Sequence, residues 1–357
     1  SLVGSEMCIR DRDVTPSLYD DVTVGGIDNE VLVGYGAPKN NGAYHALIWR
    51  SGGSVTDLHS AGYANTAAYG IWQDYQVGAG SGPATDNQEH ALLWSSTPNS
   101  CVDLHPADFT SSIAYSVCDD VQVGSGMGPD YQNHALLWQG TAASVVDLHP
   151  AGYSSSWARG VDENGQVGYG MYTASGGAFH ALLWSDTAAS AVDLHPAGFY
   201  LSQAVDIAGE VQVGYGAGAN TGWRYHALAW NGTAENAVDL HGFLAGDYDA
   251  SYAYGIDNDG VIVGAASLQG HSVAVLWRPV SQDVLDIVLK FTAQTINLQA
   301  MGQWFAAHVT LPEGKVFGDV DVSSIRLLDI VAADKVSIDS EANILTCLLY
   351  TSPSPRD

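Results

Sequence analysis

The stretch that decides the fold is His134-Ala-Leu-Leu-Trp138, which is followed eight residues past its tryptophan by Val146-Asp-Leu-His149. Both motifs recur along the chain, so the sequence is built from repeats. The sixth copy of the first motif is degenerate and reads Val273-Ala-Val-Leu-Trp277. The repeated tryptophans lie 44 to 47 residues apart, at Trp49, Trp94, Trp138, Trp184, Trp230 and Trp277.

Each unit contains two further segments upstream of its tryptophan motif. One is a Val-Gly run such as Gln166-Val-Gly-Tyr-Gly170, and the other ends in a turn such as Asp162-Glu-Asn-Gly165. None of the four segments is long enough for a helix, and β-favouring residues dominate them. Four short strands in about 45 residues are typical of one blade of a β-propeller. The sequence therefore predicts an all-β fold, a six-bladed β-propeller of four-stranded blades, with an open stack of hairpin sheets as the alternative.

The ordered motifs resemble the HAF-type extracellular repeat of bacterial and archaeal secreted proteins. The resemblance covers roughly residues 22–277, and it departs from the usual pattern in having Leu where the family name implies Phe and Asp-Leu-His where Asp-Leu-Gly is commoner. It implies an extracellular or cell-surface location. It brings no established catalytic residues.

The two ends differ from the repeats in composition and pattern. Residues 1–12 and 347–357 look like translated sequencing adapters at the edges of a metagenomic contig, and they are excluded from the fold. Alternating strand patterns after Trp277 indicate a second module, truncated near Thr346. The expected organisation is a propeller over 13–287 and a partial β-sandwich over 288–346.

Composition excludes several classes of function. The chain has 12 Lys and Arg against 39 Asp and Glu, a net charge of −27, so nucleic acid is an improbable partner. It has no apolar run long enough to insert into a membrane. Once the ends are removed, Cys101 and Cys118 remain, which are too few for a disulfide framework. Whether these two pair is left open.

The recurrent histidines and aspartates allow two interpretations. They could ligate a metal, or they could form one structural hydrogen bond that is repeated in every blade. Repetition favours the structural role, because six blades do not each need a reactive centre. The six tryptophans are interpreted in the same way, as core between the blades.

Functional residues are expected where the units differ, because the repeated part encodes the scaffold. The variable position of the first segment would ring one mouth of the central channel, and it places Arg159 among tyrosines that could stack on a sugar. The loops before the tryptophan motif add exposed aromatic residues. The candidate ligand-binding residues are Arg159, Tyr69, Tyr115, Tyr254, Trp223, Arg224 and Tyr225.

The predicted function is a secreted or cell-surface, non-catalytic binding or structural module, with extracellular polysaccharide or a cell-surface component as the expected partner. The alternative is a propeller-fold polysaccharide lyase or glycoside hydrolase that acts on an anionic polysaccharide. The sequence carries none of the common enzyme signatures and predicts no catalytic residue, no metal site and no cofactor. Weak Ca²⁺ binding by the Asp162–Gly165 and Asp257–Gly260 turns stays open.

Overall fold

The computed structural model describes residues 15–39, 42–50, 54–244 and 248–279, together with five strands between 288 and 350. The chain divides into two compact units. One is Arg12–Pro279, and the other combines Ser1–Asp11 with Val280–Asp357. Each unit is considered by itself. The predicted adapter residues 1–12 and the end of the chain after Tyr350 lie outside the described residues.

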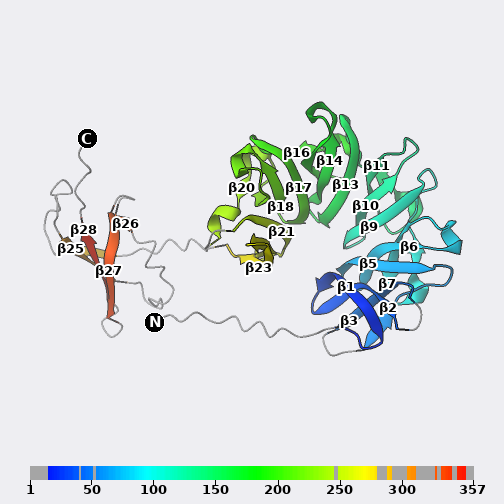
Figure 1. The fold of residues 1–357 in the computed structure, drawn as a ribbon, viewed down its shortest axis with the longest axis horizontal. Helices are drawn as coiled ribbons and strands as arrows, with labels where there is room; N and C mark the ends of the chain where they lie inside the picture. Colours follow the sequence, from blue (N-terminus) through cyan, green and yellow to red (C-terminus); the bar gives the residue numbers. More distant parts are fainter. Residues whose placement is uncertain are drawn as a thin grey trace. The chain divides into compact units, whose positions relative to one another are not determined.

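The first unit consists of six consecutive antiparallel sheets, which are called blades 1 to 6 (Figure 1). Blade 1 contains β1 (Tyr19–Asp28), β2 (Val31–Pro38), β3 (His45–Arg50) and β4 (Val55–Asp57). Blade 2 contains β5 (Asn65–Trp72), β6 (Tyr75–Ser81), β7 (His90–Ser95) and β8 (Val102–Asp103). Blade 3 contains β9 (Ser111–Cys118), β10 (Val121–Met127), β11 (Asn133–Trp138) and β12 (Val146–Asp147).

The remaining blades repeat this order. Blade 4 contains β13 (Tyr153–Asp162), β14 (Gly165–Tyr172), β15 (Ala178–Trp184) and β16 (Val192–Asp193). Blade 5 contains β17 (Phe199–Ala208), β18 (Val211–Gly218), β19 (His226–Trp230) and β20 (Val238–Asp239). Blade 6 contains β21 (Ala250–Ile256), β22 (Ile262–Leu268) and β23 (His271–Trp277). The predicted all-β propeller of six blades is confirmed, and the expected fourth strand of blade 6, near Asp286, lies outside the described residues.

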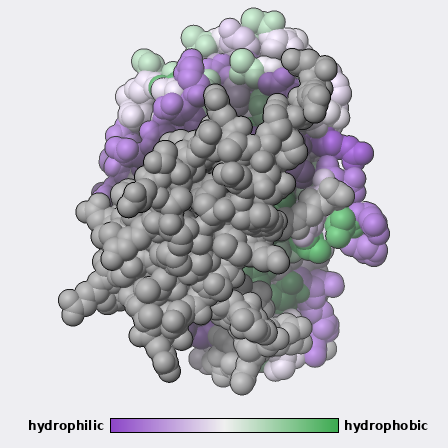
Figure 2. Space-filling model, turned by 90° about the vertical axis from the view of Figure 1, so that its left-hand side faces the viewer, coloured by the Kyte–Doolittle hydropathy of each residue, from purple (hydrophilic) through white to green (hydrophobic). Residues whose placement is uncertain are grey.

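Short 3-10 turns connect the strands of the blades. They are η1 (Pro83–Thr85), η2 (Pro98–Ser100), η3 (Ala142–Ser144), η4 (Thr173–Ser175), η5 (Ala188–Ser190), η6 (Ala219–Thr221), η7 (Ala234–Asn236) and η8 (His241–Phe243). No described helix is long and apolar enough to cross a bilayer. In Figure 2, the surface that is not covered by grey atoms is mainly hydrophilic with a few hydrophobic groups, in keeping with the acidic composition.

The second unit holds one five-stranded antiparallel sheet in the order β24-β25-β28-β27-β26. Its strands are β24 (Val288–Phe291), β25 (Trp304–Thr310), β26 (Arg326–Leu327), β27 (Val331–Asp339) and β28 (Ile344–Tyr350). Strand β28 runs across the boundary that the sequence predicts at residue 346. The β-sandwich assignment of this unit stays a prediction.

A β-bulge in the first strand of every blade positions the variable residue of the repeat. In blade 4, Ala158 pairs with Gly168 and Gly160 pairs with Val167, so Arg159 is the extra, unpaired residue. A bulge of this kind redirects one side chain and increases the local twist. It also brings the carbonyl oxygen of Trp157 so close to Gly168 that a Cβ there would collide with it. The glycine of each Val-Gly run is therefore a requirement of the bulge.

Each blade packs on the next through one repeated apolar interface. Between blades 3 and 4, Val123 and Leu137 of the first blade contact Ala158 and Trp184 of the second. The same positions build the clusters between the other consecutive blades. Full burial of one such side chain contributes about 1.5–3 kcal/mol. The prediction that the tryptophans form the core between blades is confirmed for Trp94, Trp138, Trp184, Trp230 and Trp277.

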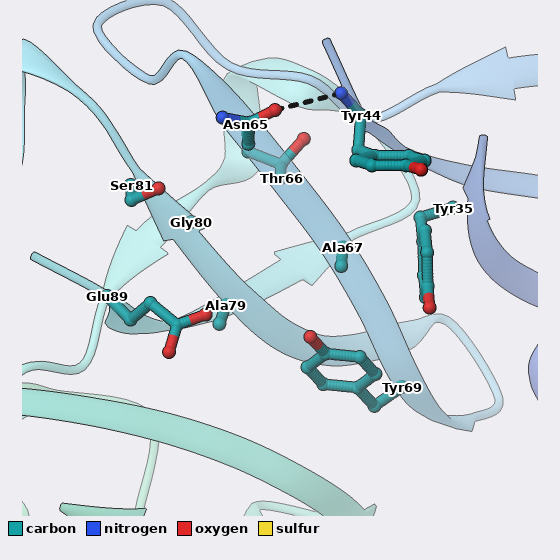
Figure 3. Close-up of a pocket in the computed structure, with 10 residues that line it drawn as sticks. All are labelled: Tyr35, Tyr44, Asn65, Thr66, Ala67, Tyr69, Ala79, Gly80, Ser81 and Glu89. Atoms are coloured by element: carbon teal, nitrogen blue, oxygen red, sulfur yellow. Dashed lines mark hydrogen bonds between the residues drawn. The ribbon is translucent and has the colours of Figure 1, made fainter. Parts of the chain in front are cut away.

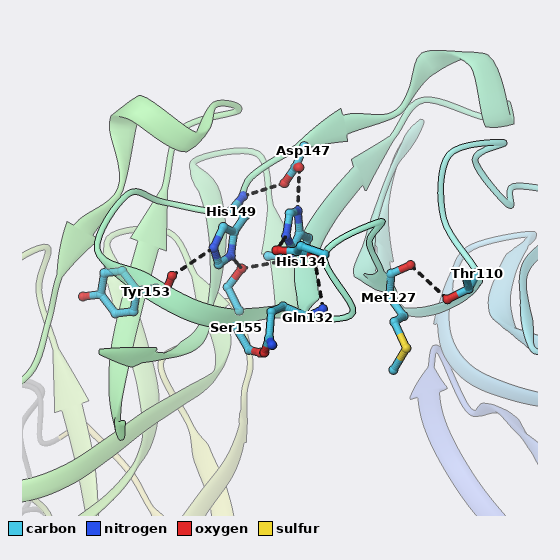
Figure 4. A network of polar contacts seen from close by, with 11 residues as sticks. Thr110, Met127, Gln132, His134, Asp147, His149, Tyr153 and Ser155 are labelled. Atoms are coloured by element: carbon cyan, nitrogen blue, oxygen red, sulfur yellow. Dashed lines mark hydrogen bonds and ion pairs between the residues drawn. The ribbon is translucent and has the colours of Figure 1, made fainter. Parts of the chain in front are cut away.

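A polar network joins the same blades, and Figure 4 shows the copy between blades 3 and 4. His134 Nδ1 lies 2.7 Å from Asp147 Oδ2, and Asp147 Oδ1 accepts the backbone N–H of His149. The ring of His149 stacks on His134 with centroids 4.2 Å apart. Ser156 of blade 4 lies 2.8 Å from His149 Nδ1 and accepts the backbone N–H of Ala135. We call this group of contacts the blade latch.

The hydroxyl of the latch both donates and accepts. His149 Nε2 lies 3.1 Å from the carbonyl oxygen of Tyr153, which can only accept. The proton of the neutral imidazole is therefore on Nε2, and Ser156 donates to Nδ1. The five latch hydroxyls are Thr66, Ser112, Ser156, Ser202 and Ser251. The predicted structural role of the repeated His and Asp residues is confirmed.

Removal of one latch hydroxyl should destabilise the propeller. In a Ser156→Ala variant, the buried Ala135 N–H and the imidazole of His149 lose their partner, at a cost of about 1–3 kcal/mol. The matched control is Ser156→Thr, because Thr66 performs the same task between blades 1 and 2. Urea denaturation followed by tryptophan fluorescence measures both variants. Equal midpoints for the Ala variant and the parent would contradict this role.

Acid should also weaken the latches. Burial, and next the charge of the stacked first histidine, lower the pKa of five latch histidines, namely His59, His105, His149, His195 and His241. Below their ordinary pKa of 6.5 the unfolded chain binds more protons at these sites, so stability falls as the pH falls.

Two groups act in the opposite direction. Burial raises the pKa of Asp206 to about 6, and Asp147 and Asp130 raise the pKa of His134 although burial lowers it. By number, the five histidines with a lowered pKa favour a net loss of stability as the pH falls. We expect the melting temperature to decrease as the pH is lowered from 7.5 to 5.5, and to decrease less steeply in a His149→Gln variant. A melting temperature that is constant or rises over this range would refute the account.

Candidate functional site

The bulge residues of blades 2, 3 and 4 converge at the middle of the propeller. The ring of Tyr69 lies 6.2 Å from that of Tyr115, and the guanidinium of Arg159 lies 4.0 Å above the Tyr115 ring. First strands of neighbouring blades pack side by side, which brings their bulges together (Figure 1). The structure therefore groups three of the residues that the sequence selected, Tyr69, Tyr115 and Arg159.

Tyr69 also belongs to a pocket between blades 1 and 2 that sequence analysis did not find. Tyr35 meets Tyr44 edge to face at 5.5 Å and Tyr69 edge to face at 6.3 Å. The pocket has a volume of about 260 Å³, and Ala67 supplies part of its floor (Figure 3). We call Tyr35, Tyr44 and Tyr69 the tyrosine cage.

A carboxylate completes the pocket. Glu89 lines it from the start of the third strand of blade 2, and its carboxylate points toward the space that the Tyr69 hydroxyl also faces (Figure 3). Among the described residues, Glu89 makes no side-chain hydrogen bond or ion pair. Burial and then the charge of Glu89 raise the pKa of Tyr69 to about 12. The hydroxyl of Tyr69 therefore stays protonated at neutral pH, beside the carboxylate of Glu89.

Small residues and backbone contacts hold the cage open. Tyr44 donates its backbone N–H to Asn65 Oδ1 at 3.0 Å, and its carbonyl accepts the N–H of Thr66 at 2.8 Å. These bonds fix the loop of blade 1 on the first strand of blade 2. Ala67 stands where the other five blades carry larger side chains, and Ala79 stands where every other blade except blade 6 does, so the space between the tyrosines stays empty of protein atoms.

Arg159 brings a positive charge close to the tyrosines of the neighbouring blades. No described carboxylate lies within ion-pair distance of its guanidinium, which stacks on Tyr115. The charge of Arg159 acts to lower the pKa of Tyr69, whereas that of Glu89 acts to raise it. The two charged groups therefore act on the Tyr69 hydroxyl in opposite directions.

The other predicted residues lie elsewhere. Tyr254 stacks on Tyr252, and about half of its side chain is exposed. It also interacts with Tyr215. The three neighbours in sequence at 223–225 separate in space: Trp223 contacts Tyr200, and Arg224 pairs with Asp249 at 3.3 Å. Tyr225 packs between Tyr215 and Tyr252. No described contact joins Trp223 or Arg224 to Arg159, whereas Tyr254 and Tyr225 both interact with Tyr215, whose pKa the charge of Arg159 acts to lower.

Two columns of the repeat contained the signal for the missed residues. The residue after each Val-Gly pair reads Tyr35, Ala79, Ser125, Tyr169, Tyr215 and Ala265. The residue before each tryptophan motif reads Tyr44, Glu89, Asn133, Phe179, Tyr225 and Ser272. Glu89 is the one acidic residue of the second column, and it lines the same pocket as Ala67 and Ala79 of blade 2. A comparison of all variable columns, and not the first segment alone, would have found the cage.

The turns considered for Ca²⁺ use their carboxylates internally. Asp162 Oδ1 accepts the N–H groups of Asn164 and Gly165, and Asp257 Oδ1 accepts those of Asp259 and Val261. Over the described part of the chain, no group of three or more acidic, His or Cys residues is arranged to hold a metal ion. Cys101 and Cys118 are both free thiols.

Comparisons with known proteins show the fold and no family. No family model matches the chain, and no curated protein matches it. Similar solved structures include the β-propeller domain of the Trilobed protease from Pyrococcus furiosus, at 9% identity and a TM-score of 0.49 over 83% of this chain and 96% of that one. TolB from Acinetobacter baumannii matches at 10% identity and a TM-score of 0.42, over 70% of this chain and 60% of that one. Oligopeptidase B from Leishmania major matches at 10% identity and a TM-score of 0.44, over 84% of this chain and 46% of that one.

The comparison corrects the predicted function. These similar structures are named as peptidases and TolB proteins and not as carbohydrate binders, so the prediction of a polysaccharide-binding module is wrong. The alternative of a polysaccharide lyase or glycoside hydrolase falls with it. This chain spans about half to three-fifths of the TolB and oligopeptidase B chains. An extracellular or cell-surface location stays a prediction from the sequence.

Proposed function

We propose that the propeller binds an organic cation through an alkylammonium group held in the tyrosine cage. The observation that carries this proposal is the combination of three tyrosine rings with an unpaired carboxylate in one small pocket. The face of an aromatic ring attracts a cation, and each such contact contributes about 0.5–2 kcal/mol. The carboxylate of Glu89 adds an electrostatic attraction, which an alkylated ammonium can use although it has no N–H group to donate.

Size and charge support the same ligand. A volume of about 260 Å³ lies below the roughly 300–1,000 Å³ of pockets that take a whole drug-sized molecule, so it suits one head group. A net charge of −27 raises the local concentration of cations at the surface. Glu89, which lines the pocket, attracts a cation, and Arg159, which stacks on Tyr115, repels one.

The test compares choline with its neutral isostere 3,3-dimethylbutanol by NMR titration. We expect choline to shift the cage resonances with saturation and the isostere to leave them unchanged. Tyr69→Ala should weaken choline binding about 2- to 30-fold, which corresponds to the loss of one ring contact. Tyr69→Phe should keep the affinity, and Glu89→Gln should lower it.

Two further variants serve as controls. Tyr131 is an exposed tyrosine outside the cage, so Tyr131→Ala should bind as the parent does. Arg159→Gln removes a like charge and should bind choline at least as tightly. Equal binding of choline and the isostere, or an Arg159→Gln variant that loses choline, would contradict the proposal.

The source of the ammonium group is a separate question for the same assay. A peptide carrying trimethyllysine and the same peptide with unmodified lysine distinguish a protein segment from a free quaternary amine. Preference for the modified peptide over choline assigns the cage to a protein partner, and preference for choline assigns it to a small solute.

We also infer that the six units are HAF-type repeats. The ordered recurrence of the motifs supports this, because each motif serves the same structural task wherever it occurs, the Asp-Leu-His motif in blades 1 to 5. The Val-Gly run accommodates the bulge, the tryptophan motif supplies the core between blades, and Asp-Leu-His supplies the latch.

A further inference from the structure

One valine of the second strand marks the side of each blade that packs on the next, which we call the forward face. This valine is fully buried in blades 1 to 5, as Val33, Val77, Val123, Val167 and Val213. The equivalent residue of blade 6 by strand register is Val263, and its side chain is 47% exposed. The forward face of blade 6 therefore lacks the cover that the other five faces have.

Two more residues on the forward face of blade 6 are exposed where their equivalents in the other blades are buried or half-buried. Ala274 is exposed, whereas the alanine of the other five tryptophan motifs is fully buried, and Leu276 is 37% exposed. A Cβ on Gly70 or Gly160 would collide with the first strand of the following blade. A Cβ on Gly255 would meet Val263 and the preceding Asp206, and no atom of a following blade.

Blade 1 lacks cover on its opposite side, which we call the rear face. The first-strand alanine that meets the preceding blade is fully buried in blades 2 to 6, but blade 1 carries Val24 there, which is 46% exposed. Ile27 is 66% exposed, whereas its equivalents are buried or half-buried. Leu47 and Trp49 of the same blade are buried, so the open area is the inner half of the rear face.

The two open faces correspond to the interface that the chain makes five times, except that Leu47 and Trp49 on the outer half of the rear face are already buried. Strands of consecutive blades pack closely from blade 1 to blade 6, but no strand pair of the described blades 1 and 6 packs in this way. On both faces a valine also replaces a polar residue of the latch. Val273 replaces the first latch histidine in blade 6, and Val22 replaces the latch hydroxyl in blade 1.

These replacements make the pair apolar on both sides. A latch histidine opposite Val22, or a latch hydroxyl opposite Val273, would leave a polar group without its partner at the contact, which costs about 1–3 kcal/mol. With valine on each side, neither of these two side chains is left unpaired, although the N–H of Ala274 has no latch hydroxyl as its acceptor. The two faces are therefore complementary in shape, by analogy with the other interfaces, and in polarity.

We propose that two copies of this chain associate head to tail, with the forward face of blade 6 of one copy packed on the rear face of blade 1 of the other. The argument for a second copy as the occupant is continuity. The required partner surface is present on every chain, and the same contact is formed five times within it. A contact between unlike faces is heterologous, so it can add further copies.

The test blocks one face at a time. Val24→Arg places a charge on the rear face, Val263→Arg places one on the forward face, and both positions are exposed in the single chain. Val238→Arg is the matched control, because Val238 is 46% exposed on the outer strand of blade 5. Light scattering after size-exclusion chromatography gives the mass of each variant over a range of concentrations.

We expect the parent and the Val238→Arg control to grow in mass with concentration, and more so at 0.5 M than at 0.05 M salt, because salt screens the repulsion between acidic chains. Each blocked variant should be monomeric. An equimolar mixture of the two should form a dimer that does not grow, because each supplies the one face that the other has lost.

Three results would overturn the proposal. A parent that is monomeric at every concentration shows that no second copy binds these faces. A mixture that stays monomeric shows that the faces do not recognise each other. A lower melting temperature of the monomeric Val24→Arg or Val263→Arg variant, with the control unchanged, shows that the two faces are packed within one chain.

Discussion

The fold depends on one hydroxyl group at each boundary between blades. Ser156 accepts a backbone N–H of blade 3 and donates to a histidine of the same blade, and its own strand belongs to blade 4. The apolar contacts around it supply most of the free energy of packing, but they do not by themselves fix how far one sheet slides along the next. The latch fixes that register, because a shift would leave the buried N–H and the imidazole unpaired.

Register matters because the candidate site is formed between blades. Tyr35 and Tyr44 come from blade 1, and Tyr69 and Glu89 come from blade 2. The latch hydroxyl Thr66 lines the same pocket and bonds both His59 and the backbone of Ala46. The bulge then turns Tyr69 toward the middle of the propeller. Scaffold and site therefore share residues, and the repeated part of the sequence sets the geometry in which the variable part acts.

Much of the architecture follows from the sequence alone, because a repeat exposes its own periodicity. The tryptophan spacing gave the blade count, and the recurrence of Asp-Leu-His indicated a structural role for its histidine. The site was harder to predict. Arg159, Tyr69 and Tyr115 share one repeat position, so comparison of the units found them, whereas Glu89 and Tyr35 occupy other columns and meet only across a blade boundary. The separation of Trp223 from Tyr225 could not be predicted, because a positive φ at Trp223 turns the chain there. The carbohydrate function rested on exposed aromatics and a resemblance, and neither specifies a ligand.

Native-state hydrogen exchange tests the role of the latch most directly. The amides of Ala46, Ala91, Ala135, Ala181 and Ala227 donate to the latch hydroxyls. If the latches hold the blades in register, these five amides exchange only when the whole propeller unfolds, with one common free energy that matches denaturant unfolding. Exchange of these amides through local opening, at free energies well below that of global unfolding and different from blade to blade, would contradict the account.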